Sequence, residues 1–298
     1  MATLRELKGR IGSVASSEKI TGAMKMISSA KMHKAEGILH RLQPFRDCVQ
    51  SIIGNLLSSD ASVISPMTEQ RPTVQRAVIV VLGSDDGLCG AYNINIFKGL
   101  IQSVARLRAT YGKTIGIEIM PIGKKMRRPV EKFAEGDANL YVATPSEGLD
   151  SKSDGENVRQ LADSLQKRFL TGEVDKVELL YMHYYTAGRQ RLVTRDYLPV
   201  SRESLAATDS PKTDKPYIFE PDAATIFDTV LPMYVLANLQ EAFAENRASE
   251  QAARVMAMQS ANDNAQKLLE QLQLEYNKLR QQSITNELLD ILGGQARD

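Results

Sequence analysis

The last quarter of the sequence constrains the fold most, because nearly every residue from Pro221 to Gly294 favours an α-helix. In this stretch no proline follows Pro232 and no glycine precedes Gly293. Apolar and small residues recur at alternating steps of three and four, which is typical of a coiled coil. This seam comprises Val255, Met258, Asn262, Ala265, Leu269, Leu272, Tyr276 and Leu279. Roughly 70 helical residues would be on the order of 105 Å long, so the helix needs a partner helix.

The first 57 residues predict that partner. Leu4, Leu7, Ile11 and Val14 form its first seam, and a second seam resumes out of phase with the first. The second seam consists of Ile20, Met24, Ile27, Lys31, Lys34 and Ile38. Pro44 is expected to bend or re-cap the helix. Glycines also recur here, among them Gly9, Gly12, Gly22 and Gly37, and the sequence leaves open whether these four admit a close partner or are tolerated on the surface.

The charges of the two chain ends are complementary. Residues 1–50 carry nine Lys or Arg against four acids, a net charge of +5. Residues 222–298 carry six Lys or Arg against eleven acids, a net charge of −5. We therefore expect the two helices to pair antiparallel, with the end of the second helix extending past the start of the first as a lone tip.

The residues between the helices alternate between strand and helix patterns, which indicates a mostly parallel sheet with its last strand at an edge. Strands are predicted at 77–82, 115–122, 140–142, 177–185 and 191–200, and helices at 93–111, 126–133 and 157–170. Two segments read as a linker and a loop, Ser58–Arg76 and Ser201–Pro216. The helix predicted at 93–111 is expected to bury Ile94, Phe97, Ile101, Val104 and Leu107.

The predicted fold class is therefore α/β plus a long antiparallel coiled coil, in which paired N- and C-terminal helices carry an inserted Rossmann-like α/β domain. We expect domain limits of 1–58, 74–205 (the foot) and 221–298. The sequence contains no run of about 18 uncharged apolar residues, so no membrane span is predicted. The N-terminus lacks a secretory or transit pattern, which favours an intracellular protein. Cys48 and Cys89 share no CxxC spacing, so no structural disulfide or zinc site is expected.

A glycine-rich turn at Gly83–Gly90 lies where α/β proteins often hold phosphates. Its spacing matches neither GxGxxG nor GxxxxGK[ST], and two adjacent aspartates would repel an anion, so we expect no nucleotide binding here. The glycines are instead expected to serve tight turns and close packing. Asp85 and Asp86 keep open an alternative, a small α/β metal-dependent enzyme with a helical oligomerisation arm. The histidines His33, His40 and His183 show no metal-binding spacing, and we expect a non-catalytic protein without a cofactor.

Two helical stretches are candidates for partner contacts. Met24 and Lys25 combine a flexible thioether with a cation, which suits a changing surface but equally suits an ordinary seam and solvated face. The apolar tip that contains Leu288 and Ile291 would be a liability unless it enters a sleeve on a partner. The basic first helix also allows a third hypothesis, a coiled-coil adaptor that binds DNA.

Three motifs, found in the same order, resemble the gamma subunits of rotary F-type ATP synthases. They are KITGAMKM at Lys19–Met26, SDDGLCG at Ser84–Gly90, and ENRASEQAARVMAM at Glu245–Met258 with RQQSITNEL at Arg280–Leu288. The similarity covers essentially the whole chain. Asp86 stands where that family commonly has arginine, and Ala91 where a second glycine is usual, so the ion pairing of this loop departs from the family pattern.

The resemblance implies a central-stalk rotor subunit of a proton-translocating ATP synthase. Its helices would sit inside a head of alpha and beta subunits, and its foot would rest on the membrane ring of c subunits with the epsilon subunit. Nucleotides would bind in the head and not in this chain, and no nucleic acid is implied. The residues that match positions where shaft and head meet are Lys25, Arg254, Arg280, Gln281, Thr285 and Glu287. A bacterial source would place the chain at the cytoplasmic face of the inner membrane as a peripheral protein.

Overall fold

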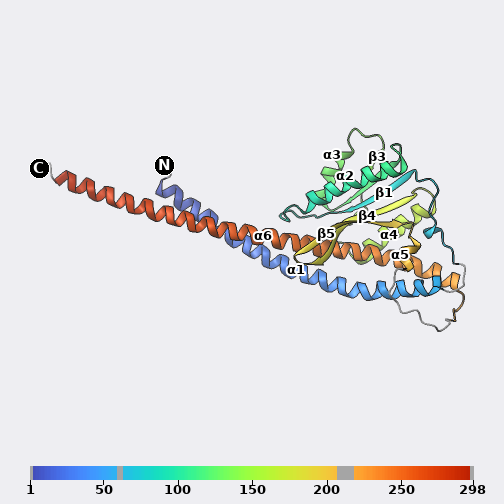
Figure 1. The fold of residues 1–298 in the computed structure, drawn as a ribbon. Helices are drawn as coiled ribbons and strands as arrows, with labels where there is room; N and C mark the ends of the chain where they lie inside the picture. The colour runs from blue at the N-terminus through green and yellow to red at the C-terminus, as the bar shows by residue number, and fades with distance from the viewer. Residues whose placement is uncertain (1–2, 59–62, 207–217, 296–298) are drawn as a thin grey trace. The chain divides into compact units, whose positions relative to one another are not determined.

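Two long helices open and close the chain in the computed structural model, which describes residues 3–58, 63–206 and 218–295. They are α1 (Leu4–Ser58) and α6 (Ala223–Gln295) (Figure 1). The chain divides into two compact units: unit 1 is Met1–Ser29 with Arg254–Asp298, and unit 2 is Ala30–Ala253. Both long helices therefore contribute to both units, and the domain limits 1–58, 74–205 and 221–298 stay predictions. No helix in the described ranges is both long and apolar enough to cross a membrane.

Unit 1 is a pair of helical segments, and its seams confirm the expectation of a coiled coil. Every predicted seam position of α6, from Val255 to Leu279, is buried or half-buried. Between 264 and 282, every residue of α6 that lies off this seam is exposed. On α1 the first seam is also covered, with Leu7 only 1% exposed. The 3.5-residue period therefore holds along both helices of the unit.

The second seam predicted for α1 is wrong. Ile20 is 60% exposed and Ile27 is 56% exposed, and Lys31 and Lys34 are exposed as well. Instead, the steps of three and four continue after Val14 without a change of phase. The positions covered at these steps are Glu18, Thr21, Lys25 and Ser28 in unit 1, then Met32, Ala35 and Leu39 in unit 2. Small and amphipathic side chains fill the unit 1 stretch, so an apolar pattern misses it. The helix also continues through Pro44 without restarting.

Unit 2 contains a five-stranded sheet with the order β3-β2-β1-β4-β5. The strands are β1 (Arg76–Leu82), β2 (Gly116–Ile122), β3 (Leu140–Val142), β4 (Lys176–Thr186) and β5 (Arg189–Leu198). β1 pairs in parallel with β2 and β4, and β2 pairs in parallel with β3, whereas β5 runs antiparallel to β4 at the edge. The mostly parallel sheet with an edge strand is thus confirmed.

Helices cover both faces of this sheet, as its continuous apolar strands require. On one face α2 (Tyr92–Tyr111) and α3 (Lys124–Ala134) pack against Ala77, Ile79 and Val81 of β1. On the other face α4 (Gly155–Leu170) and the unit 2 parts of α1 and α6 pack against the alternate residues of the same strand. Figure 1 shows the unit 2 parts of α1 and α6 on the side of the sheet away from α2 and α3.

Two details of unit 2 differ from expectation. Ile94 is 59% exposed and Ile101 is 41% exposed, because α2 turns Ile96 and Leu100 toward the sheet instead. The segment expected to be a polar loop begins with a short helix, α5 (Arg202–Ala206). Its Leu205 is fully buried in the core, which explains why this part of the segment is ordered as a helix. The remaining residues, 207–217, lie outside the described part of the chain.

Candidate functional site

The seam of unit 1 includes a polar contact between the two helices. Asn262 of α6 donates its side-chain amide hydrogen to the backbone oxygen of Glu18 at 2.8 Å. A Cβ on Gly22 would lie 3.4 Å from this amide nitrogen. Gly9, Gly12 and Gly37 would meet nothing within 4 Å. Of these four glycines, Gly22 is therefore the one at a close approach, and a polar seam residue of this kind fixes the register of a helix pair.

The nine residues expected to contact partners all belong to unit 1. Five of them are exposed on α6: Arg280, Gln281, Thr285, Glu287 and Leu288. Their polar contacts are local, since the Thr285 hydroxyl donates to the backbone oxygen of Gln281 at 2.9 Å and the Ser283 hydroxyl to Glu287 at 3.4 Å. Their outer faces thus remain open to a partner.

The other four are placed differently. Met24 and Lys25 of α1 are half-buried, and Lys25 occupies a seam position. Arg254 is only 5% exposed, so the chain itself covers most of its side chain. Ile291 lies in α6, beyond the residues whose side chains are described. Lys25 and Arg254 therefore have less surface for a partner than the residues near the end of α6.

Large apolar side chains are exposed on both helices of unit 1. On α1, Ile20 is 60% exposed, Met26 74% and Ile27 56%. Near the end of α6, Leu288 is 55% exposed and Leu289 is 60% exposed. The sequence analysis assigned Ile20 and Ile27 to the seam and so missed them as candidate contact residues. Exposed apolar groups clustered on one element are typical of a protein-binding surface.

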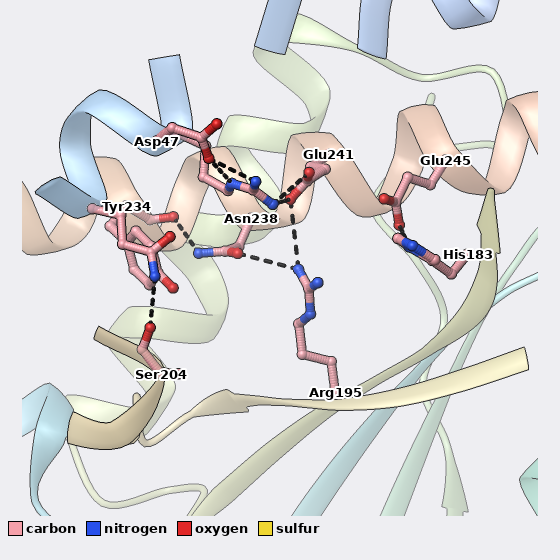
Figure 2. A network of polar contacts seen from close by, with 10 residues as sticks. Asp47, His183, Arg195, Ser204, Tyr234, Asn238, Glu241 and Glu245 are labelled. Carbon is pink, nitrogen blue, oxygen red and sulfur yellow. Dashed lines mark hydrogen bonds and ion pairs between the residues drawn. The ribbon is translucent and has the colours of Figure 1, made fainter. Parts of the chain in front are cut away.

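In unit 2, α6 buries a row of polar residues that we call the polar anchor: Asn238, Glu241, Glu245, Asn246 and Ser249. Figure 2 shows Asn238, Glu241 and Glu245 turned toward side chains of the sheet and of α1. Sequence reasoning did not find these residues. The available signal was a helix in which Ala, Leu and Phe surround the glutamates on every side, which predicts burial of the charges too.

Glu241 is the charged centre of the polar anchor. Its side chain is 2% exposed, and the Arg46 guanidinium of α1 donates to both its oxygens at 2.7 and 2.8 Å. Arg195 of β5 approaches the same carboxylate to 3.6 Å and donates to the Asn238 side-chain oxygen at 3.2 Å (Figure 2). One carboxylate of α6 therefore joins the first helix to the edge of the sheet.

Both arginines remain charged in this environment. Burial lowers the pKa of the Arg46 guanidinium, but its hydrogen bond to Asp47 and the charge of Glu241 outweigh that effect and raise the pKa above its usual value. Burial likewise lowers the pKa of Arg195, but the neighbouring Tyr181 and Glu241 raise it by more. The pKa of Arg195 therefore also lies above its usual value. The Glu241 carboxylate thus has two permanent cationic neighbours, which a buried charge requires.

The rest of the polar anchor binds α6 to the middle of the sheet. Glu245 lies 2.7 Å from Nδ1 of His183 on β4, and the Ser249 hydroxyl donates to the backbone oxygen of Met182 at 3.0 Å. Asn246 donates to the backbone oxygen of Gly83 at 3.0 Å and accepts from the Tyr92 hydroxyl at 2.7 Å. Asn246 is 2% exposed, so these bonds are shielded from water. The turn after β1 is therefore attached to α6.

The glycine-rich turn is built for packing and for capping. A Cβ on Gly83 would lie 2.0 Å from Cγ of Met126, and Gly90 adopts a φ of 60°. Asp85 is fully engaged, because it accepts from the Lys124 backbone N–H at 2.9 Å and from the Ser151 hydroxyl at 2.7 Å. Asp86 forms an ion pair with Lys152 at 3.0 Å. In the described part of the chain, no group of three or more His, Cys, Asp or Glu could hold a metal ion.

Comparison with known proteins decides the family. A model of the ATP synthase family matches residues 3–296. The ATP synthase gamma chain of Bacteroides thetaiotaomicron is 39% identical, and that of Bacteroides fragilis strain ATCC 25285 is 40% identical; each alignment covers 99% of both chains. The chain belongs to the ATP synthase gamma chain family.

Solved structures agree with the fold of a gamma chain. A chain of the rotor of Euglena gracilis mitochondrial ATP synthase matches with a TM-score of 0.60 and 20% identity, over 94% of this chain and 98% of that one. A chain from the central stalk and c-ring of Tetrahymena thermophila ATP synthase matches with a TM-score of 0.53 and 20% identity, over 81% and 99%. As a gamma chain, this protein is the rotor subunit of the central stalk and is not itself catalytic.

Proposed function

We propose that this gamma chain transmits rotation between a membrane ring of c subunits and a catalytic head of alpha and beta subunits. Unit 1 would contact the head, and the foot, which belongs to unit 2, would contact the ring together with the epsilon subunit. Two structural relatives support this assignment, since one belongs to a mitochondrial rotor and the other to a central stalk with its c-ring. We propose that the chain acts as a peripheral protein at the cytoplasmic face of a bacterial inner membrane.

The observation that carries the proposal is the polar anchor. Torque applied at the foot reaches the shaft only if the sheet is held to the long helices, and five buried polar residues of α6 make that attachment. Buried charged pairs are costly to break, by several kcal/mol, because separation leaves an uncompensated charge. The anchor therefore suits a joint that must not slip under load.

Contacts with the head have the opposite requirement, since the shaft must leave each angular position again. A two-helix shaft has no threefold symmetry, so at any moment it presents a different surface to each catalytic site. Exposed ion pairs are worth about 0–1 kcal/mol each and are readily exchanged. We propose weak, exchangeable contacts of three kinds: ion pairs of Lys25, Arg280 and Glu287, hydrogen bonds of Gln281 and Thr285, and packing of Met24. Leu288 and Ile291 would be seated in an apolar sleeve. The covered Arg254 would contribute less.

A reconstituted complex in vesicles tests this assignment. The variant R280A/Q281A/T285A/E287A is expected to assemble normally but to lower ATP-driven proton pumping several-fold, because up to four exchangeable contacts are lost. A matched control places four alanines on exposed polar residues of unit 2: Lys98, Gln102, Arg159 and Gln160. Deleting residues 288–298 is expected to reduce the yield of complex while the foot stays folded. Normal pumping in the quadruple variant and normal yield after the deletion would contradict the proposal.

A further inference from the structure

The outer face of α3 carries a dense cluster of positive charge. Within Lys124–Lys132 five side chains are both cationic and exposed: Lys124, Lys125, Arg127, Arg128 and Lys132. The opposite face buries Met126 and Val130 against the sheet. Three of the cations lie at steps of four residues and so form one row along the helix. We call Lys124, Arg128 and Lys132 the basic ridge.

This charge is placed against the local preferences of the helix. Like charges at a spacing of four residues repel each other, and cations in the first turn oppose the helix dipole. α3 has no acidic residue in its first turn. Among the described residues, no ion pair joins any of the five cations to a carboxylate. Lys132 in the last turn suits the dipole, and Glu131 lies four residues after Arg127 without forming an ion pair in the described part of the chain. One carboxylate against five cations leaves most of this charge uncompensated on the helix, which is expected where a site serves an external ligand.

We propose that the basic ridge docks an acidic segment of a protein partner, in addition to the contacts of the helix pair. Neighbouring ridge residues are about 5–6 Å apart, which matches carboxylates four residues apart on a partner helix. Alternate residues of a partner strand, about 6.6–6.8 Å apart, fit nearly as well. The guanidinium groups of Arg127 and Arg128 also suit carboxylates, which they can bind with two parallel hydrogen bonds.

The shape of the surface favours a protein segment over a membrane or a nucleic acid. The ridge is only about 12 Å long, the length of one short acidic segment, whereas a polyanion or a bilayer surface would engage a broader area. No large apolar residue of α3 is exposed, so nothing on this face would insert into a membrane. The ridge therefore recognises its partner through the partner's carboxylates alone, and added salt should weaken the contact.

The inference rests on the proposed function in one respect: the partner is expected to be another chain of the assembled complex. A water-soluble carbodiimide joins a lysine amine to a carboxylate in direct contact, and peptide mass spectrometry then identifies both residues. In the purified complex, Lys124, Lys125 or Lys132 is expected to be joined to an Asp or Glu of another protein chain. In the variant K124E/R128E/K132E, the product at Lys125 is expected to fall about tenfold, since each exposed pair contributes a factor of about two to five.

Controls separate this inference from the proposed function. The triple variant K98E/R159E/K167E makes the same charge change on exposed residues of α2 and α4, and it should leave the Lys125 product unchanged. Raising the salt before coupling should reduce the product. If the complex assembles and pumps protons but none of the ridge lysines couples to another chain, the inference is overturned while the proposed function stands. Loss of binding to phosphatidylglycerol vesicles or to duplex DNA in the ridge variant, without any protein product, would also overturn it.

Discussion

Arg46→Met tests the polar anchor most sharply, because it removes one partner of a buried ion pair and leaves the other. The Glu241 side chain is 2% exposed and accepts two hydrogen bonds from Arg46, whereas Arg195 is farther away at 3.6 Å. Breaking a buried pair in this way costs about 3–5 kcal/mol. Because Arg195 still neutralises part of the charge, we expect about 3 kcal/mol.

Substitution of the other member of the ion pair should cost less. In Glu241→Met, the Arg46 side chain is already 24% exposed and keeps Asp47 at 2.7 Å, so a loss of about 1.5 kcal/mol is expected. The double variant should lose only about 2 kcal/mol, because no buried carboxylate is left without its partner. The interaction energy between the two sites is then about 2.5 kcal/mol, within the range measured for residues in direct contact.

Equilibrium unfolding of the full chain in urea, followed by far-ultraviolet circular dichroism, measures these differences. The control is Lys152→Met, which breaks an exposed ion pair with Asp86 and should change stability by less than about 1 kcal/mol. If Arg46→Met lies within about 0.5 kcal/mol of the parent chain, or if the two single losses simply add, the reasoning about the anchor is refuted.

Three further predictions concern unit 2. Gly83→Ala should cost about 1–3 kcal/mol, because its Cβ would meet Met126 at 2.0 Å, whereas Gly87→Ala, whose nearest neighbour is at 3.8 Å, should be nearly neutral in the same urea assay. Asn246→Ala should cost about 2 kcal/mol by leaving buried groups without partners, which thermal melting would reveal as a lower midpoint. Burial raises the pKa of Asp175, but backbone N–H donors and a neighbouring arginine lower it more, so its folded pKa lies below its unfolded value. Its contribution is therefore present above about pH 4 and lost as the pH falls through the lower folded pKa. Asp175→Asn should cost about 2 kcal/mol at pH 7, and a pH series of melts should show that difference shrinking toward pH 3.

The sequence predicts those helices and strands of this fold in which the buried positions are occupied by apolar residues. The seam from Val255 to Leu279 and the strand Ala77–Leu82 are confirmed because burial there follows hydrophobicity. The prediction fails on α1 because Glu18 and Lys25 occupy seam positions while Ile20 and Ile27 face outward. Such an inversion is expected where a helix serves an internal partner on one side and an external partner on the other.

The polar anchor could not be predicted from composition, because glutamates are assigned to the surface by default. Glu241 and Glu245 are buried only because residues distant in the sequence, Arg46 and His183, meet them in the folded unit. The turn after β1 was predicted more fully, since its glycines do serve close packing and a left-handed turn. Its attachment to α6 through Asn246 has no local signal.

Rotation itself can be observed directly in single complexes. Cys48 is exposed and Cys89 is buried, so a thiol-reactive biotin would attach a visible probe at Cys48 of α1. With the catalytic head fixed to a surface, ATP is predicted to drive steady rotation of the probe in one direction. A probe that stays still while the same complexes hydrolyse ATP would contradict the assignment of this chain as the rotor.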